Sequence, residues 1–195
     1  TSNFTIDSLA PNPNAITLNS ASLTNNNVIA FNVTSCSDTP YVLINEGSAP
    51  ARTALEWQAC STALGAITYT LPNNTEGSRT LKAWFKDAVG NVSLTSTDNN
   101  IIYDITPATL SLTAIPSEIR GGNTQAVTFS QSDINGIAST KLQYAQDGTT
   151  FSDVDLNPTS PYTWNIPTHN TSTAKLKLIV VDNAGNSTSV DTISF

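Results

Sequence analysis

The chain contains no methionine and a single histidine, and only 12% of its residues are charged. No apolar run approaches the ~20 residues of a membrane-spanning helix, and no stretch of about ten residues shows a helical apolar period. The eight Lys and Arg residues form no cluster, and a net charge of −7 would repel a phosphate backbone. These absences argue against a helical fold, against direct membrane insertion and against nucleic acid as a partner.

The sequence also starts without the basic, apolar and small-residue pattern of a secretory leader. We therefore expect it to be a mature or excised fragment, with any membrane anchor outside it.

One phrase occurs twice, as LKAWFKDAVGN at residues 81–91 and as LKLIVVDNAGN at residues 176–186, which is an offset of 95 residues. This offset is too long for a solenoid unit and fits a small domain. Each copy is an alternating apolar run closed by Asp-x-x-Gly-Asn, which is typical of a strand, a tight turn and a return strand. The repeat predicts two domains, residues 1–104 and 105–195.

Period-2 alternation between turn signals indicates an all-β fold with about seven short strands per repeat. Such a set fits a Greek-key β-sandwich in each domain. We expect strands in the first repeat near residues 15–18, 28–33, 41–44, 55–57, 67–71, 81–86 and 101–103. In the second repeat we expect them near residues 109–113, 126–129, 141–145, 153–156, 162–166, 175–181 and 190–195.

Both cysteines, Cys36 and Cys60, belong to the first repeat. No histidine or further cysteine stands at ligand spacing, so a metal pair is disfavoured, and a disulfide is the favoured interpretation. A disulfide indicates an oxidising compartment, either extracellular or periplasmic. The alternative, two buried free thiols in a cytosolic protein, fits poorly with so much Asn, Ser and Thr.

The junction between the repeats is short. It reads YDITPA at residues 103–108, with one proline and no glycine, so we expect it to restrict rotation more than a flexible linker would.

Residues 77–93, followed by residues 102–107, resemble the end of one bacterial immunoglobulin-like (Big-type) repeat and the start of the next. Repeats of this family finish in an Asp-Ala-Ala-Gly-Asn-like turn and an Asp-Thr-Thr-Ala-Pro-like linker. The WQAC run at residues 57–60, with Cys36 upstream, is similar to a disulfide-bearing subtype. The resemblance implies immunoglobulin-like sandwiches in a secreted or cell-surface protein, associated with the outer membrane and often an adhesin. Its partners would be neighbouring repeats of the same chain, or a glycan or protein on another cell.

The immunoglobulin-like fold brings the last hairpin turn, the loop after the second strand and the amino-terminal linker to one pole of each domain. These places hold aspartates in both repeats. The candidate ligands for a metal are Asp104, Asp133 and Asp182 in the second repeat, and Asp7, Asp38 and Asp87 in the first. Three converging carboxylates would favour Ca²⁺ at this interdomain pole, with Glu76 as a further ligand across the junction. The alternative is that these aspartates only hold their turns.

We expect no enzymatic activity, because His169 is the only histidine and no motif places a nucleophile beside it. Trp84 alternates with inward-facing neighbours and is expected to be partly exposed, where its ring could stack on a sugar. The other interpretation makes all three tryptophans core residues.

Two functions remain open at this stage: a non-enzymatic adhesion or display stalk, and a glycan- or protein-binding tip. A third alternative is a pair of accessory domains of a larger surface enzyme.

Overall fold

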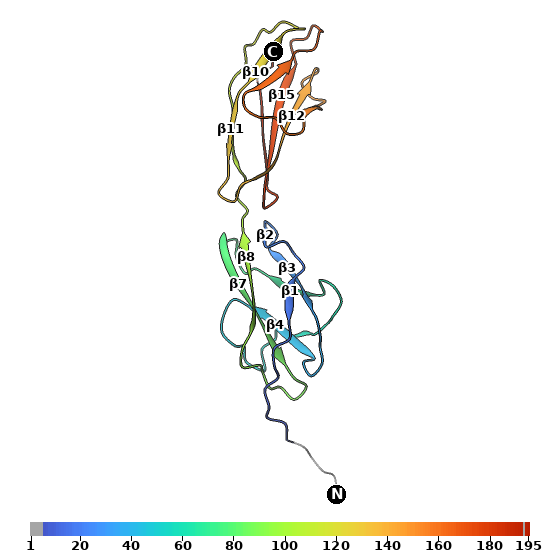
Figure 1. Ribbon diagram of the computed structural model, residues 1–195, viewed down its shortest axis with the longest axis vertical. Helices are drawn as coiled ribbons and strands as arrows, with labels where there is room; N and C mark the ends of the chain where they lie inside the picture. The colour runs from blue at the N-terminus through green and yellow to red at the C-terminus, as the bar shows by residue number, and fades with distance from the viewer. Residues whose placement is uncertain (1–5, 193) are drawn as a thin grey trace. The chain divides into compact units, whose positions relative to one another are not determined.

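The computed structural model describes residues 6–192 and 194–195. Its backbone forms two compact units, Thr1–Asp104 (unit 1) and Ile105–Phe195 (unit 2), and each is considered by itself below (Figure 1). Every regular element within the described residues is a strand. No helix in those ranges could cross a membrane.

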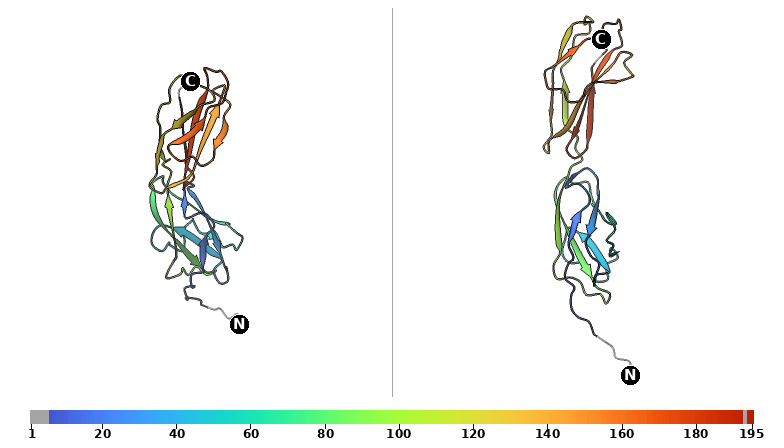
Figure 2. Two further views of the ribbon diagram at one scale, coloured as in Figure 1. Left: turned by 45° about the horizontal axis from the view of Figure 1, so that its top comes forward. Right: turned by 45° about the vertical axis from the view of Figure 1, so that its right-hand side comes forward.

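Unit 1 consists of two packed β-sheets, visible as two layers in Figure 2. The smaller sheet has the order β1-β3-β6, formed by Ile16–Leu18, Val28–Val33 and Ile67–Thr70. The larger has the order β2-β8-β7-β4-β5, formed by Leu23–Thr24, Thr97–Tyr103, Gly77–Lys86, Tyr41–Asn45 and Gln58–Ala59. Neighbouring strands are antiparallel except for β2 and β8, which run parallel.

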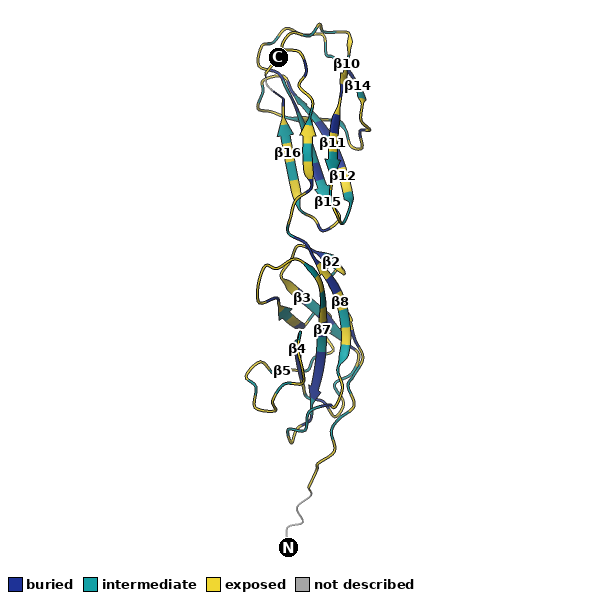
Figure 3. Cartoon of the chain, turned by 90° about the vertical axis from the view of Figure 1, so that its left-hand side faces the viewer, coloured by how far each residue is buried: buried dark blue, intermediate teal, exposed yellow. Residues whose placement is uncertain are grey.

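The core of unit 1 follows from the period-2 alternation of its strands (Figure 3). Ile29 and Phe31 on β3 are buried, while the residues between and beside them are more exposed. Leu81, Ala83 and Phe85 on β7 are buried in the same way. The alternating apolar residues of the two sheets therefore supply the interior of the sandwich.

Unit 2 has one continuous sheet and one interrupted sheet. The continuous sheet has the order β13-β12-β15-β16, formed by Ser152–Asp155, Ile137–Ala145, Lys175–Asp182 and Ser187–Asp191. Opposite it lie two strand pairs, β9 with β11 and β10 with β14, formed by Thr109–Leu112, Phe129–Ser132, Thr124–Val127 and Tyr162–Asn165. The single strand predicted at residues 126–129 is wrong in this respect, because the ladder breaks at Thr128 and separates β10 from β11.

An aromatic and aliphatic cluster fills unit 2. Leu142, Leu176 and Leu178 are fully buried at its centre. The Trp164 ring lies 5.3 Å from the Tyr144 ring and 5.8 Å from the Phe195 ring, measured between centroids. Trp164 is therefore a core residue.

One predicted strand of unit 1, at residues 55–57, is wrong. This segment is a turn, and the short edge strand β5 begins only at Gln58. The indole N–H of Trp57 donates to the carbonyl oxygen of Ala51, at 3.0 Å, which holds the chain in a local loop instead of a sheet ladder. With the two-residue strands β2 and β5 included, the described part of each unit has eight strands where the sequence predicts about seven.

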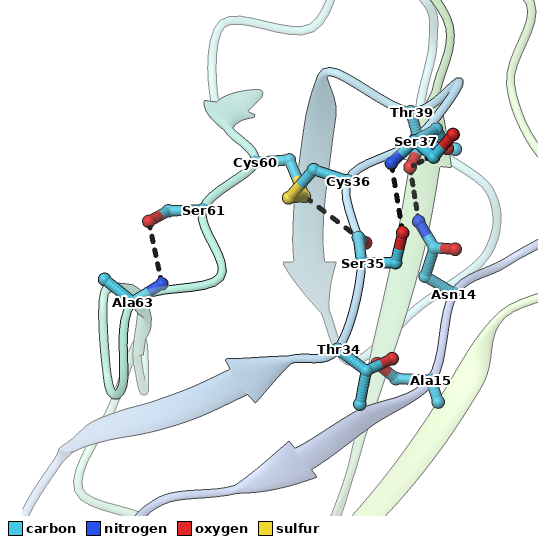
Figure 4. Close-up of a disulfide and its surroundings, with 10 residues drawn as sticks. All are labelled: Asn14, Ala15, Thr34, Ser35, Cys36, Ser37, Thr39, Cys60, Ser61 and Ala63. Atoms are coloured by element: carbon cyan, nitrogen blue, oxygen red, sulfur yellow. Dashed lines mark hydrogen bonds between the residues drawn. A yellow bond between two sulfur atoms is a disulfide. The ribbon is translucent and has the colours of Figure 1, made fainter.

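The predicted disulfide between Cys36 and Cys60 is confirmed, with Cα atoms 5.7 Å apart (Figure 4). Cys36 follows β3 of the smaller sheet, and Cys60 follows β5 at the edge of the larger sheet. The backbone N–H of Cys60 also donates to the carbonyl oxygen of Pro40, at 2.8 Å. The disulfide thus links the smaller sheet to the end of the β4–β5 connection, which belongs to the larger sheet.

Replacing both cysteines by alanine is expected to lower the free energy of unfolding of unit 1 by ~3 kcal/mol, because the unfolded chain loses a closed loop. Urea unfolding, followed through NMR signals of residues in each unit, measures this change. The signals of unit 2 supply the internal control. An unchanged midpoint for unit 1 would contradict the prediction.

Candidate functional site

The Asp-x-x-Gly-Asn turn of unit 1 is organised around the carboxylate of Asp87. Its Oδ1 accepts the backbone N–H groups of Val89, Gly90 and Asn91, at 3.0, 2.7 and 2.8 Å. Its Oδ2 accepts the side-chain amide of Asn91, at 2.7 Å. Gly90 has a φ of 100°, which explains why glycine occupies this position.

Burial by itself would raise the pKa of the Asp87 carboxyl, but the hydrogen bonds donated by the turn outweigh that effect and hold the pKa below its usual value. The carboxylate is only 8% exposed. Asp87 is therefore a buried carboxylate whose negative charge is stabilised by hydrogen bonds from the amide groups of its own turn.

Unit 2 repeats this construction. Oδ1 of Asp182 accepts the backbone N–H groups of Ala184 and Asn186, at 2.9 and 2.8 Å, and Oδ2 accepts the side-chain amide of Asn186, at 2.9 Å. Gly185 has a φ of 96°. Both repeated aspartates thus have a structural role that their turns alone explain.

The three aspartates predicted as ligands in the first repeat line one hollow of unit 1, about 420 Å³ in volume. Asp7 lies on the amino-terminal segment, Asp38 in the turn after β3, and Asp87 in the turn after β7. The side-chain amide of Asn91 donates to the carbonyl oxygen of Asp7, at 3.3 Å, and so joins that segment to the turn. Within the described residues these carboxylates do not form a close group of metal-ligand type, since the only such group lies elsewhere.

That group consists of the three aspartates predicted in the second repeat. Asp104, Asp133 and Asp182 offer ligand atoms that all lie within 4.8 Å of one another. Asp133 and Asp182 belong to unit 2. Asp104 directly precedes Ile105, the first residue of unit 2. Glu76, the other predicted ligand, directly precedes β7 of unit 1.

The three carboxylates differ in exposure and in support. Asp104 and Asp182 are 3% and 1% exposed, whereas Asp133 is half-buried. Oδ1 of Asp133 accepts the backbone N–H of Asn135, at 2.7 Å. Carboxylates this close repel one another, and a hard cation with oxygen ligands would relieve the repulsion. The arrangement therefore has the chemistry of a Ca²⁺ ligand set.

Trp84, the predicted sugar-stacking residue, is buried, so the expectation of an exposed ring is wrong. It is 7% exposed, and its indole N–H donates to Oδ1 of Asn45, at 3.1 Å. Its cross-strand neighbour Leu43 is also buried. Trp84 does alternate away from the core, but the face to which it points is covered.

The cover is the segment between β4 and β5, residues 46–57. Lys86 shares the outer face of β7 with Trp84, and its Nζ donates to the carbonyl oxygen of Arg52, at 3.1 Å. The same Nζ lies 4.6 Å from the centroid of the Trp57 ring. These contacts lay the segment across the outer face of the larger sheet and leave no room for a sugar at Trp84.

His169 has no nucleophile beside it in the contacts of the described residues. Its Nε2 forms a short hydrogen bond with the hydroxyl group of Tyr144, and the two rings are 5.8 Å apart. Both cysteines are held in the disulfide. The histidine is exposed, and among the described residues its side chain has contacts with Tyr144.

A polar hollow in unit 2 has no counterpart among the sites predicted from the sequence. It is bordered by the hairpin turn at Asp147-Gly148 and by the segment that follows β14. Asp147-Gly148 is a typical turn pair, but the facing segment lines the hollow only with Thr and Asn side chains, which are typical of any surface loop. The single available signal was the concentration of hydroxyl and amide side chains on both segments.

No family model and no curated protein matches the sequence. Among solved structures, the chain is similar to the fibronectin(III)-like modules of CbhA from Clostridium thermocellum, with a TM-score of 0.55 and 18% identity over 92% of this chain and 94% of that one. Chicken CNTN1 FN1-FN3 domains match at a TM-score of 0.41 and 10% identity, over 95% and 69% of the two chains. A tetra-tandem repeat from the extending region of a large adhesion protein matches at 0.32 and 14%, over 91% and 47%.

At these identities the similarity concerns the fold alone. The argument for the fold rests on the CbhA modules, which have a TM-score of 0.55. Two packed sheets of mostly antiparallel strands are the architecture that immunoglobulin and fibronectin type III domains share. The chain therefore has the all-β, immunoglobulin-like sandwich fold that its sequence predicts.

Proposed function

We propose that this chain is part of a secreted or cell-surface bacterial protein of the immunoglobulin-like repeat type, acting without catalysis in adhesion or as a display stalk. The observation that carries the proposal is the Cys36–Cys60 disulfide in a small sandwich domain. Disulfides persist in oxidising compartments outside the cytosol. The tandem arrangement and the stiff composition of the junction at residues 103–108 favour a spacer.

The contacts of the reactive side chains support a non-enzymatic role. His169 is engaged with Tyr144, and the Asp87 carboxylate accepts four hydrogen bonds from its own turn. A general base needs a substrate proton within hydrogen-bonding reach, and these groups already spend their bonding capacity on the fold.

Two experiments on the source organism test the proposal. Antibodies raised against the chain are expected to label intact cells or the culture medium, and labelling only after permeabilisation would contradict a surface role. Replacing both units in the full protein by two unrelated sandwich domains of equal length separates the two candidate functions. If the two units are a spacer, the full protein keeps its adhesion after this exchange. If they are a binding tip, the adhesion is lost.

We also propose that Asp104, Asp133 and Asp182 bind Ca²⁺. Their mutual proximity supports this proposal, and so does the preference of Ca²⁺ for carboxylate and carbonyl oxygens. A bound ion would neutralise the repulsion between the carboxylates and add to the stability of the surrounding turns.

Calcium is expected to raise the midpoint of thermal unfolding of unit 2, with a gain of ~2.7 kcal/mol at a hundredfold excess over the dissociation constant. Asp133→Asn keeps an oxygen acceptor for the Asn135 N–H but removes one charge, and it should abolish most of the gain. Asp191→Asn, which changes a carboxylate paired with Lys177 on the sheet, is the matched control. Identical unfolding of the unaltered chain in calcium and in EDTA would contradict the proposal.

A further inference from the structure

The polar hollow of unit 2 is shallow and open to solvent, with a volume of about 420 Å³. It lies between the turn that joins β12 to β13 and the segment that joins β14 to β15. Every side chain that lines it is polar. The lining residues are Gln146, Asp147, Thr150, Asn170, Thr171 and Thr173.

Hydrogen bonds between the two segments fix the frame of the hollow. The hydroxyl groups of Thr171 and Thr173 both donate to the backbone carbonyl oxygen of Gln146, at 3.0 and 3.1 Å. Gly148 has a φ of 75°, and a Cβ at this position would stand 2.4 Å from the carbonyl oxygen of Thr173. Only glycine permits so close an approach, and the hollow is consequently preorganised by backbone contacts.

The carboxylate of Asp147 is held in one orientation. Its Oδ1 accepts the backbone N–H groups of Thr149 and Thr150, at 2.8 and 2.6 Å, and its Oδ2 accepts the hydroxyl group of Thr150, at 2.6 Å. The two bonds to Oδ1 use both of its lone pairs, whereas Oδ2 keeps a further lone pair for a ligand. Hydrogen bonds from Thr150, followed by that from Thr149, lower the pKa of Asp147, so the group remains an acceptor at neutral pH.

Two amide side chains complete the set. Gln146 and Asn170 are exposed, and the structure shows no hydrogen bond to either side-chain amide from the residues it describes. Each amide offers two donors and one acceptor oxygen. The hollow thus presents a fixed anionic acceptor, two free amides and a row of hydroxyl groups.

We propose that this hollow binds a neutral hexose, such as the terminal residue of a glycan. Vicinal sugar hydroxyl groups are both donors and acceptors, and they match carboxylate and amide side chains at hydrogen-bonding distance. The lining residues include no cationic side chain for an anionic ligand and no apolar side chain for a lipid. The proposal holds whether or not the chain serves as a spacer, because it concerns a site within unit 2.

The experiment is an NMR titration of the full chain, labelled with ¹⁵N, against the methyl glycosides of glucose, galactose, mannose and N-acetylglucosamine. At least one glycoside is expected to shift the side-chain NH₂ signals of Gln146 and Asn170 in a saturable manner. The backbone signals of Thr171 and Thr173 should move with them. Absence of saturable shifts with all four glycosides would overturn the proposal, as would shifts confined to residues outside the hollow.

Two variants test the assignment of the site. Asn170→Ala and Gln146→Ala are each expected to weaken binding about tenfold, because each removes hydrogen bonds that form only with the sugar. Asn157→Ala, at an exposed position outside the hollow, is the matched control and should bind like the unaltered chain. Unchanged affinity in both pocket variants, or an equal loss in the control, would overturn the proposal. The backbone signals of each variant report directly whether it is folded.

Discussion

Replacing Trp84 by alanine is expected to lower the free energy of unfolding of unit 1 by about 4 kcal/mol, since truncating a buried tryptophan removes its contacts and leaves a cavity. The ring is buried on the face of β7 where Lys86 binds the segment of residues 46–57, and its N–H donates to Asn45. Loss of the Trp84 ring is therefore also expected to loosen the packing of residues 46–57 against this face. Urea unfolding, read from NMR signals of unit 1, measures the change.

Trp57→Ala is the matched control for this experiment. The Trp57 ring is half-buried, and it contacts the ammonium group of Lys86. We expect a loss of only about 1 kcal/mol, typical of a partly exposed residue. A smaller effect for Trp84 than for Trp57 would show that Trp84 is exposed after all, and would restore it as a candidate sugar-stacking residue.

Replacing Asp87 by alanine is expected to cost unit 1 about 3.5 kcal/mol at neutral pH, because it leaves four donor groups of one turn without their acceptor. Three backbone N–H groups and the side-chain amide of Asn91 lose their partner together. Water can replace part of this bonding at the rim of the unit, which keeps the effect below the sum of four separate losses.

The pH dependence distinguishes the carboxylate from a merely bulky side chain. Because the pKa of Asp87 is lower in the folded unit than in the unfolded chain, its charge stabilises the fold above the unfolded pKa of ~3.9. This stabilisation is lost as the pH falls through the lower, folded pKa. The difference between the unaltered chain and Asp87→Ala should therefore be largest above about pH 4 and shrink in stronger acid.

Asp98→Ala provides the control, because Asp98 is a partly exposed carboxylate of unit 1 that lies 3.9 Å from Lys82. Surface pairs of this kind contribute ~0.5 kcal/mol or less. A loss at Asp87 that stays constant down to strong acid would contradict the role assigned to its charge.

Several elements could be predicted from the sequence because their causes are local. The alternation at Ile29, Phe31 and Val33 shows which side of a strand is apolar, and the structure buries all three. The Asp-x-x-Gly-Asn phrase contains both the acceptor and the glycine that its turn requires. Composition and cysteine spacing were sufficient to predict the disulfide.

The positions of the aspartates could be predicted only through the fold. Asp104, Asp133 and Asp182 were chosen because an immunoglobulin-like sandwich brings three particular loops to one pole, and the structure places them within 4.8 Å of one another. The equivalent residues of the first repeat line a hollow but form no such group. A similar spacing along the chain thus leads to two different local arrangements, and whether either binds calcium stays a prediction.

The sequence by itself determined the fold class, the turn chemistry and the disulfide, since strand periodicity, glycine at positive φ and cysteine pairing act over short stretches or follow from composition. Only the tertiary structure decided that Trp84 is buried and that Gln146 and Asn170 face one hollow. Periodicity assigns a side chain to a face of its sheet but carries no information about which distant segment covers that face. The path of residues 46–57 covers the face on which one site was predicted, and the approach of two loops in unit 2 creates a hollow that the sequence did not predict.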